Sequence, residues 1–291
     1  MLAWQSGSGK TDKQLTYQPP DPLLLNPGQA AKALLLLDID GVIRDVGGSY
    51  RRALAETVHH YCGWRPEPGT IDSLKAEGRW NNDWEASLEL LRRHRLEPLP
   101  DFAALVRVFS DFYFGGDPAG DPALWHGFIG DEPLLVDPAF FTALEQAGIA
   151  WGFVSGAEPP SARYVLEQRL GLNDPPLIAM GDAPDKPDPA GLLQLAGQLL
   201  QRHGGGALGP GGPPIAYLGD TVADVQTVLN ARAARPEQAF VSLGVAPPHL
   251  HGSAARAHYD NQLQQAGADA VLEHTTAALQ HLQALLAEPA S

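Results

Sequence analysis

Cysteine is almost absent from this sequence, which has a single one, Cys62, among its 291 residues. One cysteine excludes an intramolecular disulfide framework and any metal site built on a CxxC pair. Basic residues are also few, because 20 Lys and Arg stand against 34 Asp and Glu, for a net charge of -14. Such a chain is poorly suited to nucleic acid or to an anionic membrane surface, so a phosphate site would need its own local positive charge.

Long apolar runs are absent as well. No stretch of the sequence reaches the roughly 18 unbroken apolar residues of a membrane span. The first thirty residues contain two lysines and several prolines, and the pattern predicts neither a signal peptide nor a membrane anchor. We therefore expect a cytoplasmic protein, and the 44% hydrophobic content suffices for one domain with a large insertion or for two domains.

Short apolar runs bounded by polar residues are typical of buried parallel strands. Four of them are followed by a polar loop, at Ala33–Leu37, 150–154, 177–180 and 215–218. Helical patterns follow at 161–170, 190–202 and 222–234, and shorter runs at 239–243 and 270–272 are expected to add edge strands. Strands that alternate with helices predict an α/β fold, with a Rossmann-like three-layer arrangement around a parallel sheet.

Two segments depart from this alternation. Residues 1–31 contain Gly, Ser and Pro without periodicity, and we expect them to form an N-terminal arm. Between residues 46 and 131 the patterns are helical only, at 50–61, 83–94 and 102–114. We therefore predict a small helical domain or lid at 46–131, inserted into a core domain of residues 32–45 and 132–291.

Polar residues follow the strand runs at the place where ligands bind in an open parallel sheet, beyond the carboxyl ends of the strands. They are Asp38 and Asp40, Ser155 and Gly156, Lys186, and Asp220 and Asp224. Converging carboxylates are suited to a hard cation such as Mg²⁺, while a lysine and exposed backbone N–H groups balance the charge of a phosphoryl group. The sequence thus predicts a phosphate-handling site with Mg²⁺ as its cofactor.

The spacing of the last two aspartates supports a cation at this site. Asp220 and Asp224 are four residues apart, which would place two like charges on one face of a helix. We expect Asp220 to be the direct ligand and Asp224 to act through water or by orienting Lys186. Lys186 is also the only lysine after Lys75 in a chain that otherwise uses arginine.

In their order along the chain these residues form four motifs, namely Asp38-Ile39-Asp40-Gly41-Val42, Val154-Ser155-Gly156, Lys186-Pro187 and Gly219-Asp220-xxx-Asp224. Together they resemble the four motifs of the haloacid dehalogenase (HAD) superfamily, over roughly residues 33–280. A helical insertion directly after the first motif is similar to subfamily IA members with a helical C1 cap. The resemblance implies a HAD core with a cap domain and a Mg²⁺-dependent phosphohydrolase.

The resemblance also implies a role for each motif residue. Asp38 would attack phosphorus and form an aspartyl phosphate, which divides one difficult displacement into two steps. Asp40 would protonate the leaving oxygen and then activate water. Since halide leaves without a proton, an acid at this position favours phosphate ester chemistry. Ser155, Gly156 and Lys186 would bind the phosphoryl group, and the implied Mg²⁺ ligands are Asp38, Asp40, Asp220 and Asp224.

Specificity in capped members comes largely from the cap, so the candidates for substrate contact lie there. They are Arg51, Arg52, Trp80, Asn81, Asn82, Asp83, Trp84 and Glu85. A structural interpretation is favoured for most of them, because Asn82 with Glu85 matches a helix capping box and Trp80 with Trp84 has the spacing of a core stripe. Arg51 and Arg52 are expected to be solvated helix charges.

Several related activities are disfavoured by single residues. Sugar phosphomutases of the family carry a histidine where this chain has Tyr50. Phosphonate-cleaving relatives use a cap lysine and lack the second aspartate of the first motif; here Asp40 is present and Lys75 is the sole candidate for the cap lysine. The predicted partner is a small phosphorylated metabolite, such as phosphoglycolate, a sugar phosphate or histidinol phosphate. The alternatives are a pyrophosphatase or nucleotidase of the same fold, and a non-catalytic protein that binds a phosphometabolite.

Overall fold

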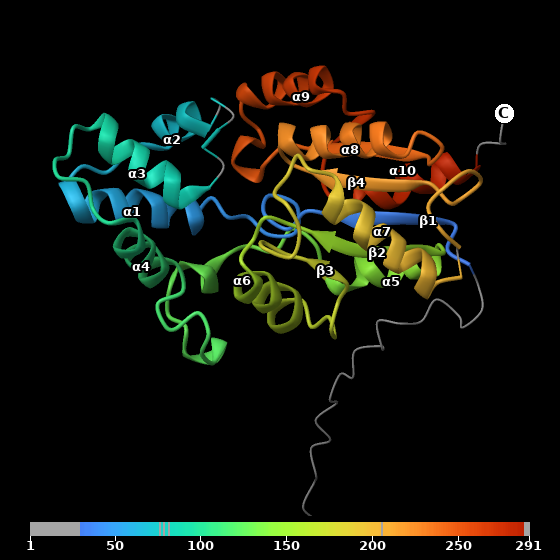
Figure 1. Ribbon diagram of the computed structural model, residues 1–291, viewed down its shortest axis with the longest axis horizontal. Coiled ribbons are helices and arrows are strands. Elements are labelled where there is room, and N and C mark those ends of the chain that lie inside the picture. Colours follow the sequence, from blue (N-terminus) through green and yellow to red (C-terminus); the bar gives the residue numbers. More distant parts are fainter. Residues whose placement is uncertain (1–29, 76, 78, 81, 205, 288–291) are drawn as a thin grey trace, which may run out of the picture.

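The computed structural model describes residues 30–75, 77, 79–80, 82–204 and 206–287 (Figure 1). Its sheet has six strands, all parallel, in the order β3-β2-β1-β4-β5-β6. The strands are β1 (Ala33–Leu37), β2 (Ile149–Val154), β3 (Leu177–Ile178), β4 (Ile215–Gly219), β5 (Phe240–Val245) and β6 (Ala270–Leu272). The predicted fold class is confirmed, but the expectation that β5 is an edge strand is wrong, because it pairs with β4 and β6.

Strand β1 shows why the sheet has helices on both faces. All five of its residues are buried, and successive side chains point to opposite faces. Leu35 and Leu37 join an apolar cluster with α5 (Pro138–Gln146), α6 (Pro159–Arg163) and α10 (Ala277–Ala287). Leu34 and Leu36 join a second cluster, with α7 (Ala190–Arg202) and α8 (Val222–Ala234). A strand buried on both faces reads as a continuous apolar run.

The helices that follow the strands agree with the periodicity in part. Helices α7 and α8 begin and end at the predicted residues, whereas the helix predicted at 161–170 begins at Pro159 and continues from α6 into a π-helical turn, η3 (Tyr164–Arg169). The predictions omitted α5, α9 (Ala255–Ala266) and α10. Of these helices, α9 packs against α8, β5 and β6. A 3₁₀ turn, η4 (Pro248–Leu250), lies between β5 and α9.

The described residues within 46–131 form helices and turns and contribute no strand to the sheet. They form α1 (Tyr50–Cys62), α2 (Pro68–Lys75), α3 (Asp83–Arg93) and α4 (Phe102–Tyr113), followed by the 3₁₀ turns η1 (Pro122–Leu124) and η2 (Phe128–Asp131). These elements have an apolar cluster of their own, which includes Leu54, Leu90 and Phe109. Figure 1 shows α1 to α4 gathered to one side of the sheet. We call these elements the helical unit; the limits of the arm, core and cap stay predictions, and residues 1–29 of the arm lie outside the described part.

The chain passes between the sheet and the helical unit twice, and the two crossings pair with each other. Arg44 forms an antiparallel bridge with Leu134. The Asp45 N–H donates to the Pro133 carbonyl at 2.9 Å, and the Leu135 N–H donates to the Ile43 carbonyl at 2.8 Å. Among the described residues, no helix has the length and apolar character needed to cross a membrane.

Candidate active site

Asp38 lies where the strand order reverses, between the carboxyl ends of β1 and β4, which is the place where open α/β sheets bind ligands. Its backbone N–H donates to the Leu218 carbonyl of β4 at 2.9 Å. One carboxylate oxygen accepts from the Ile39 N–H at 2.8 Å, and the other lies 3.0 Å from Lys186 Nζ. Burial raises the pKa of the Asp38 carboxyl to about 6, against the opposing effect of Lys186.

Lys186 contacts two carboxylates, those of Asp38 and Asp224. Its Nζ donates to Asp224 Oδ1 at 2.6 Å and to the hydroxyl of Tyr217 at 3.2 Å, and it lies 3.0 Å from Asp38 Oδ2. The Tyr217 hydroxyl also lies 2.8 Å from the Val154 carbonyl and 3.0 Å from Asp224 Oδ1. The lysine side chain is therefore fixed by contacts that reach β2, β4 and α8.

Asp224 has a second function in the local structure. Its Oδ2 accepts from the backbone N–H of Thr221 at 2.9 Å and from the hydroxyl of Thr221 at 2.6 Å, which completes a capping box at the start of α8. Although burial alone would raise it, the pKa of Asp224 is held below its ordinary value by Lys186 and Thr221. Both oxygens of this carboxylate are thus occupied, one of them by Lys186, and the predicted role of Asp224 in orienting Lys186 stays a prediction.

Asp220 approaches the first motif very closely. A Cβ at Gly41, whose φ is +76°, would lie 2.1 Å from Asp220 Oδ2, so only glycine fits at this position. Burial, followed by the charges of Asp224 and Asp38, raises the pKa of Asp220 well above its ordinary value. Within the described part of the chain, no hydrogen bond to the Asp220 carboxylate is found, which leaves its oxygens available to a ligand.

These carboxylates fit a hard divalent cation. One oxygen each of Asp38, Asp220 and Asp224 lie within 4.8 Å of one another, and the three form the one such group in the part of the chain that the structure describes. Oxygen ligands and gathered negative charge are what Mg²⁺ requires. The oxygens of Asp38 and Asp224 already contact protein donors, whereas among the described residues the Asp220 carboxylate accepts no hydrogen bond, so Asp220 is the best placed to bind directly.

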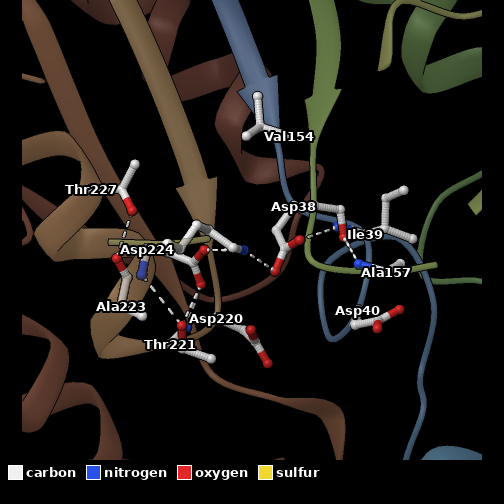
Figure 2. A network of polar contacts seen from close by, with 12 residues as sticks. Asp38, Ile39, Asp40, Val154, Ala157, Asp220, Thr221, Ala223, Asp224 and Thr227 are labelled. Atoms are coloured by element: carbon white, nitrogen blue, oxygen red, sulfur yellow. Dashed lines mark hydrogen bonds and ion pairs between the residues drawn. The ribbon is translucent and has the colours of Figure 1, made fainter. Parts of the chain in front are cut away.

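The carboxylate of Asp40 lies apart from that group. Its Oδ1 accepts from Arg44 Nε at 2.7 Å, and its side chain is 30% exposed. Figure 2 shows Asp40 in the loop that follows Asp38. The predicted metal ligand Asp40 is therefore not brought into the carboxylate group of Asp38, Asp220 and Asp224.

Ser155 and Gly156 follow β2 as predicted. Ser155 is buried, its N–H donates to the Ile178 carbonyl at 2.9 Å, and its Oγ accepts from the Ala157 N–H at 3.2 Å. Gly156 is exposed, with nothing within 4 Å of a Cβ built on it. The structure therefore brings Ser155 to the strand end and leaves Gly156 open to solvent beside it.

The candidates in the helical unit make contacts that are mainly structural. Arg51 forms an ion pair with Asp72. Arg52 is exposed, as expected of a solvated charge, and its guanidinium carbon lies 3.9 Å from the ring centroid of Phe128. Tyr50, at the start of α1, has its hydroxyl 3.5 Å from Glu158 Oε2. Tyr50 therefore faces the loop that follows β2.

The segment before α3 acts as a helix start. Asn82 Oδ1 accepts from the N–H groups of Trp84 and Glu85, at 2.9 and 3.2 Å. Asp83 pairs with Lys75 at 2.6 Å, and Trp80 Nε1 donates to a glutamate next to α2, Glu77, at 3.0 Å. Asn81 lies outside the described residues. The capping function predicted for Asn82 is confirmed.

Two buried groups next to the site were not predicted. In the sequence, Tyr217 belongs to the apolar run of β4, and nothing in the sequence indicates that its hydroxyl contacts Lys186. Arg44 reads as a surface charge, yet it is fully buried and contacts Asp40 and Glu132. The available signal was its position, since Arg44 directly follows two apolar residues, Val42 and Ile43.

Comparison with known proteins identifies relatives of this chain. The family model described as haloacid dehalogenase-like hydrolase matches residues 32–232. A protein of Phytophthora nicotianae named imidazoleglycerol-phosphate dehydratase is 30% identical over 247 residues, which are 82% of this chain and 49% of that protein. The chain therefore spans about half the length of this curated relative.

Solved structures share the fold at low identity. Phosphatase Tt82 from Thermococcus thioreducens matches with a TM-score of 0.55 and 21% identity, over 79% of this chain and 99% of that one. A phosphonoacetaldehyde hydrolase-like protein from Oleispira antarctica matches with a TM-score of 0.59 and 16% identity, over 89% and 96%.

Proposed function

The chain belongs to the haloacid dehalogenase-like hydrolase family, and on this premise we propose that it is a Mg²⁺-dependent phosphatase acting on a small phosphomonoester through an aspartyl phosphate on Asp38. The observation that carries the proposal is the surroundings of Asp38. A carboxylate at the end of β1 lies 3.0 Å from a fixed ammonium, Lys186, and faces Asp220 across the junction of β1 and β4. This arrangement offers both a nucleophile and the charge balance that a phosphoryl group requires.

The two half-reactions use neighbouring carboxylates. In the first, an Asp38 oxygen attacks phosphorus, the bond from phosphorus to the leaving oxygen breaks, and Asp40 gives its proton to that oxygen. In the second, water attacks the aspartyl phosphate, Asp40 accepts the proton of the water, and inorganic phosphate leaves with Asp38 restored. We assign Asp40 to proton transfer because its side chain is 30% exposed and it follows Asp38 by two residues in the same loop (Figure 2).

The remaining site residues would bind rather than react. Lys186 and Ser155 would contact the phosphoryl oxygens, with the exposed N–H of Gly156 beside them. Asp38 and Asp220 would hold Mg²⁺, with Asp224 behind them, and the ion when bound supplies positive charge to the phosphoryl group. The helical unit would cover the site and exclude water while the aspartyl phosphate forms.

The test is phosphate release from a panel of phosphomonoesters, with Mg²⁺ and with chelator. The panel contains phosphoglycolate, sugar phosphates, histidinol phosphate and p-nitrophenyl phosphate, and the name of the Phytophthora relative is a reason to add imidazoleglycerol phosphate. We expect Mg²⁺-dependent release that falls at least about a thousandfold in Asp38→Asn. Asp111→Asn, at an exposed position of α4, is the matched control and should behave as the wild type.

Two outcomes would contradict the proposal in different ways. Turnover that persists in Asp38→Asn would remove the proposed nucleophile. A wild type that releases phosphate from no compound, although it is folded and supplied with Mg²⁺, would contradict the phosphatase and favour a protein that binds its phosphorylated ligand without reaction.

A further inference from the structure

Arg44 lies at the centre of a buried polar cluster between the sheet and the helical unit. It has no exposed surface, and each of three guanidinium nitrogens donates to a different side chain. Nε donates to Asp40 Oδ1 at 2.7 Å, Nη1 to Glu132 Oε2 at 2.9 Å and Nη2 to Ser161 Oγ at 2.7 Å. A guanidinium with three fixed partners has no freedom to rotate, so its contact with Asp40 has a fixed direction.

The cluster extends from Arg44 into the helical unit. Glu132, which is also buried, accepts from the Ser49 hydroxyl, next to α1, and from the Tyr113 hydroxyl of α4 at 3.1 Å. The Tyr113 hydroxyl lies 2.9 Å from Ser161 Oγ of α6. The polar groups are thus connected in a closed network, which is the condition under which a buried charge is tolerated.

The network also joins the two crossings of the chain. Arg44 lies on the outgoing crossing, within four residues of Asp40, and Glu132 lies next to the returning one. The backbones of the crossings pair at Arg44 and Leu134. The orientation of the Asp40 carboxylate is therefore fixed by the same contacts that fix the passage into the helical unit.

We propose that Arg44 is a positioning residue that aligns the Asp40 carboxylate for proton transfer to the leaving oxygen, and that Glu132 keeps Arg44 in place. Arg44 occupies Oδ1 of Asp40 and leaves Oδ2 for the substrate. As the proton leaves, negative charge develops on Asp40, and a guanidinium already in contact stabilises this charge without having to reorganise. This role rests on the proposed function.

The chemistry of the leaving group separates such a role from a structural one. A nitrophenolate leaves without protonation, whereas an alkoxide requires it, so loss of proton transfer affects alkyl phosphates far more than p-nitrophenyl phosphate. The ratio of kcat/KM for the best alkyl substrate to that for p-nitrophenyl phosphate reports this difference, since both values include the transfer to Asp38 and exclude the later, shared hydrolysis. Partial unfolding lowers both values equally.

The variants are chosen so that at least one keeps the fold. Arg44→Gln alone leaves Glu132 charged and buried without its partner, a change that can unfold the protein. The double variant Arg44→Gln with Glu132→Gln removes both charges, and Arg44→Lys keeps the charge without the fork of donors. Arg169→Gln is the matched control, because Arg169 donates to the Glu132 carbonyl at 2.9 Å and is not among the partners of Asp40.

We expect kcat/KM for the alkyl phosphate to fall by about 100-fold in the double variant and by about 10-fold in Arg44→Lys. The fall for p-nitrophenyl phosphate should be at least about tenfold smaller, as it should be in Asp40→Asn, and Arg169→Gln should keep the wild-type ratio. Equal losses on the two substrates in folded variants of Arg44 would overturn the proposal. A wild type without turnover would contradict the phosphatase itself, which is a separate result.

Discussion

Replacement of Asp220 by Asn should make the protein more stable without metal and insensitive to Mg²⁺. The Asp220 carboxylate stands within 4.8 Å of Asp38 and Asp224, while Lys186 already pairs with both of those. At that distance two like charges repel by about 3.5 kcal/mol at an effective dielectric constant of about 20. With solvent screening, we expect the uncharged amide to raise the free energy of unfolding by about 1 to 3 kcal/mol, or several degrees in Tm.

The difference between the two proteins should also depend on pH. Burial and the charges of Asp224 and Asp38 raise the pKa of Asp220 above its ordinary 3.8, so over a range above that value the folded protein without metal binds a proton that the unfolded chain has lost. Its contribution makes the wild type less stable as the pH rises through this range. Asn at this position does not titrate, so the stability advantage of the variant should widen as the pH is raised from about 4.

Thermal unfolding by circular dichroism is the suitable assay, in chelator and in Mg²⁺, over a series of pH values. A cation present at about 100 times its Kd stabilises the wild type by about 2.7 kcal/mol, and Asp220→Asn should lose most of this gain. Asp111→Asn, exposed on α4, should show neither effect. A variant less stable than the wild type in chelator at neutral pH, or one that keeps the full response to Mg²⁺, would refute the reasoning.

Two further substitutions test the packing around the site. Tyr217→Phe removes a buried hydroxyl that lies 2.8 Å from the Val154 carbonyl, so urea unfolding should show a loss of about 1 to 3 kcal/mol, and an unchanged midpoint would contradict the contact. Gly41→Ala places a Cβ 2.1 Å from Asp220 Oδ2, so Mg²⁺-dependent turnover should fall at least about tenfold. Gly197→Ala in α7, where a Cβ meets nothing within 4 Å, is its control, and equal activity of the two glycine variants would show that the close approach is unimportant.

The sequence predicted best those elements in which local preference and burial agree. Strand β1 is apolar on both faces and is followed directly by the charged residue Asp38, so its C-terminal limit is visible without a structure. Helix α8 follows a capping residue, Thr221, and has its predicted limits. The strand ends then brought Asp38, Lys186, Asp220 and Asp224 together, because parallel strands meet ligands at one edge of the sheet.

The predictions failed where the burial or contacts of a side chain differ from those typical of its residue type. Arg44 is charged and would be assigned to the surface, but the acceptors that make its burial tolerable come from residues as distant as Glu132 and Ser161. The contact of the Tyr217 hydroxyl likewise depends on a residue distant in the sequence, Lys186, and cannot be predicted from the strand alone. The position of β5 inside the sheet depends on its pairing with β6, and three apolar residues are too short a signal for that pairing.

The pairing of the two crossings has a consequence for how such a protein can change. Because the Asp45 N–H meets the Pro133 carbonyl and the Leu135 N–H meets the Ile43 carbonyl, the inserted segment leaves and rejoins the core at a single point. With respect to the core, the whole insertion is equivalent to the loop of a hairpin. A longer or shorter insertion therefore changes the entropic cost of closing this loop only slightly. A lineage can therefore exchange the helical unit while the residues at the ends of β1 and β4 stay where they are.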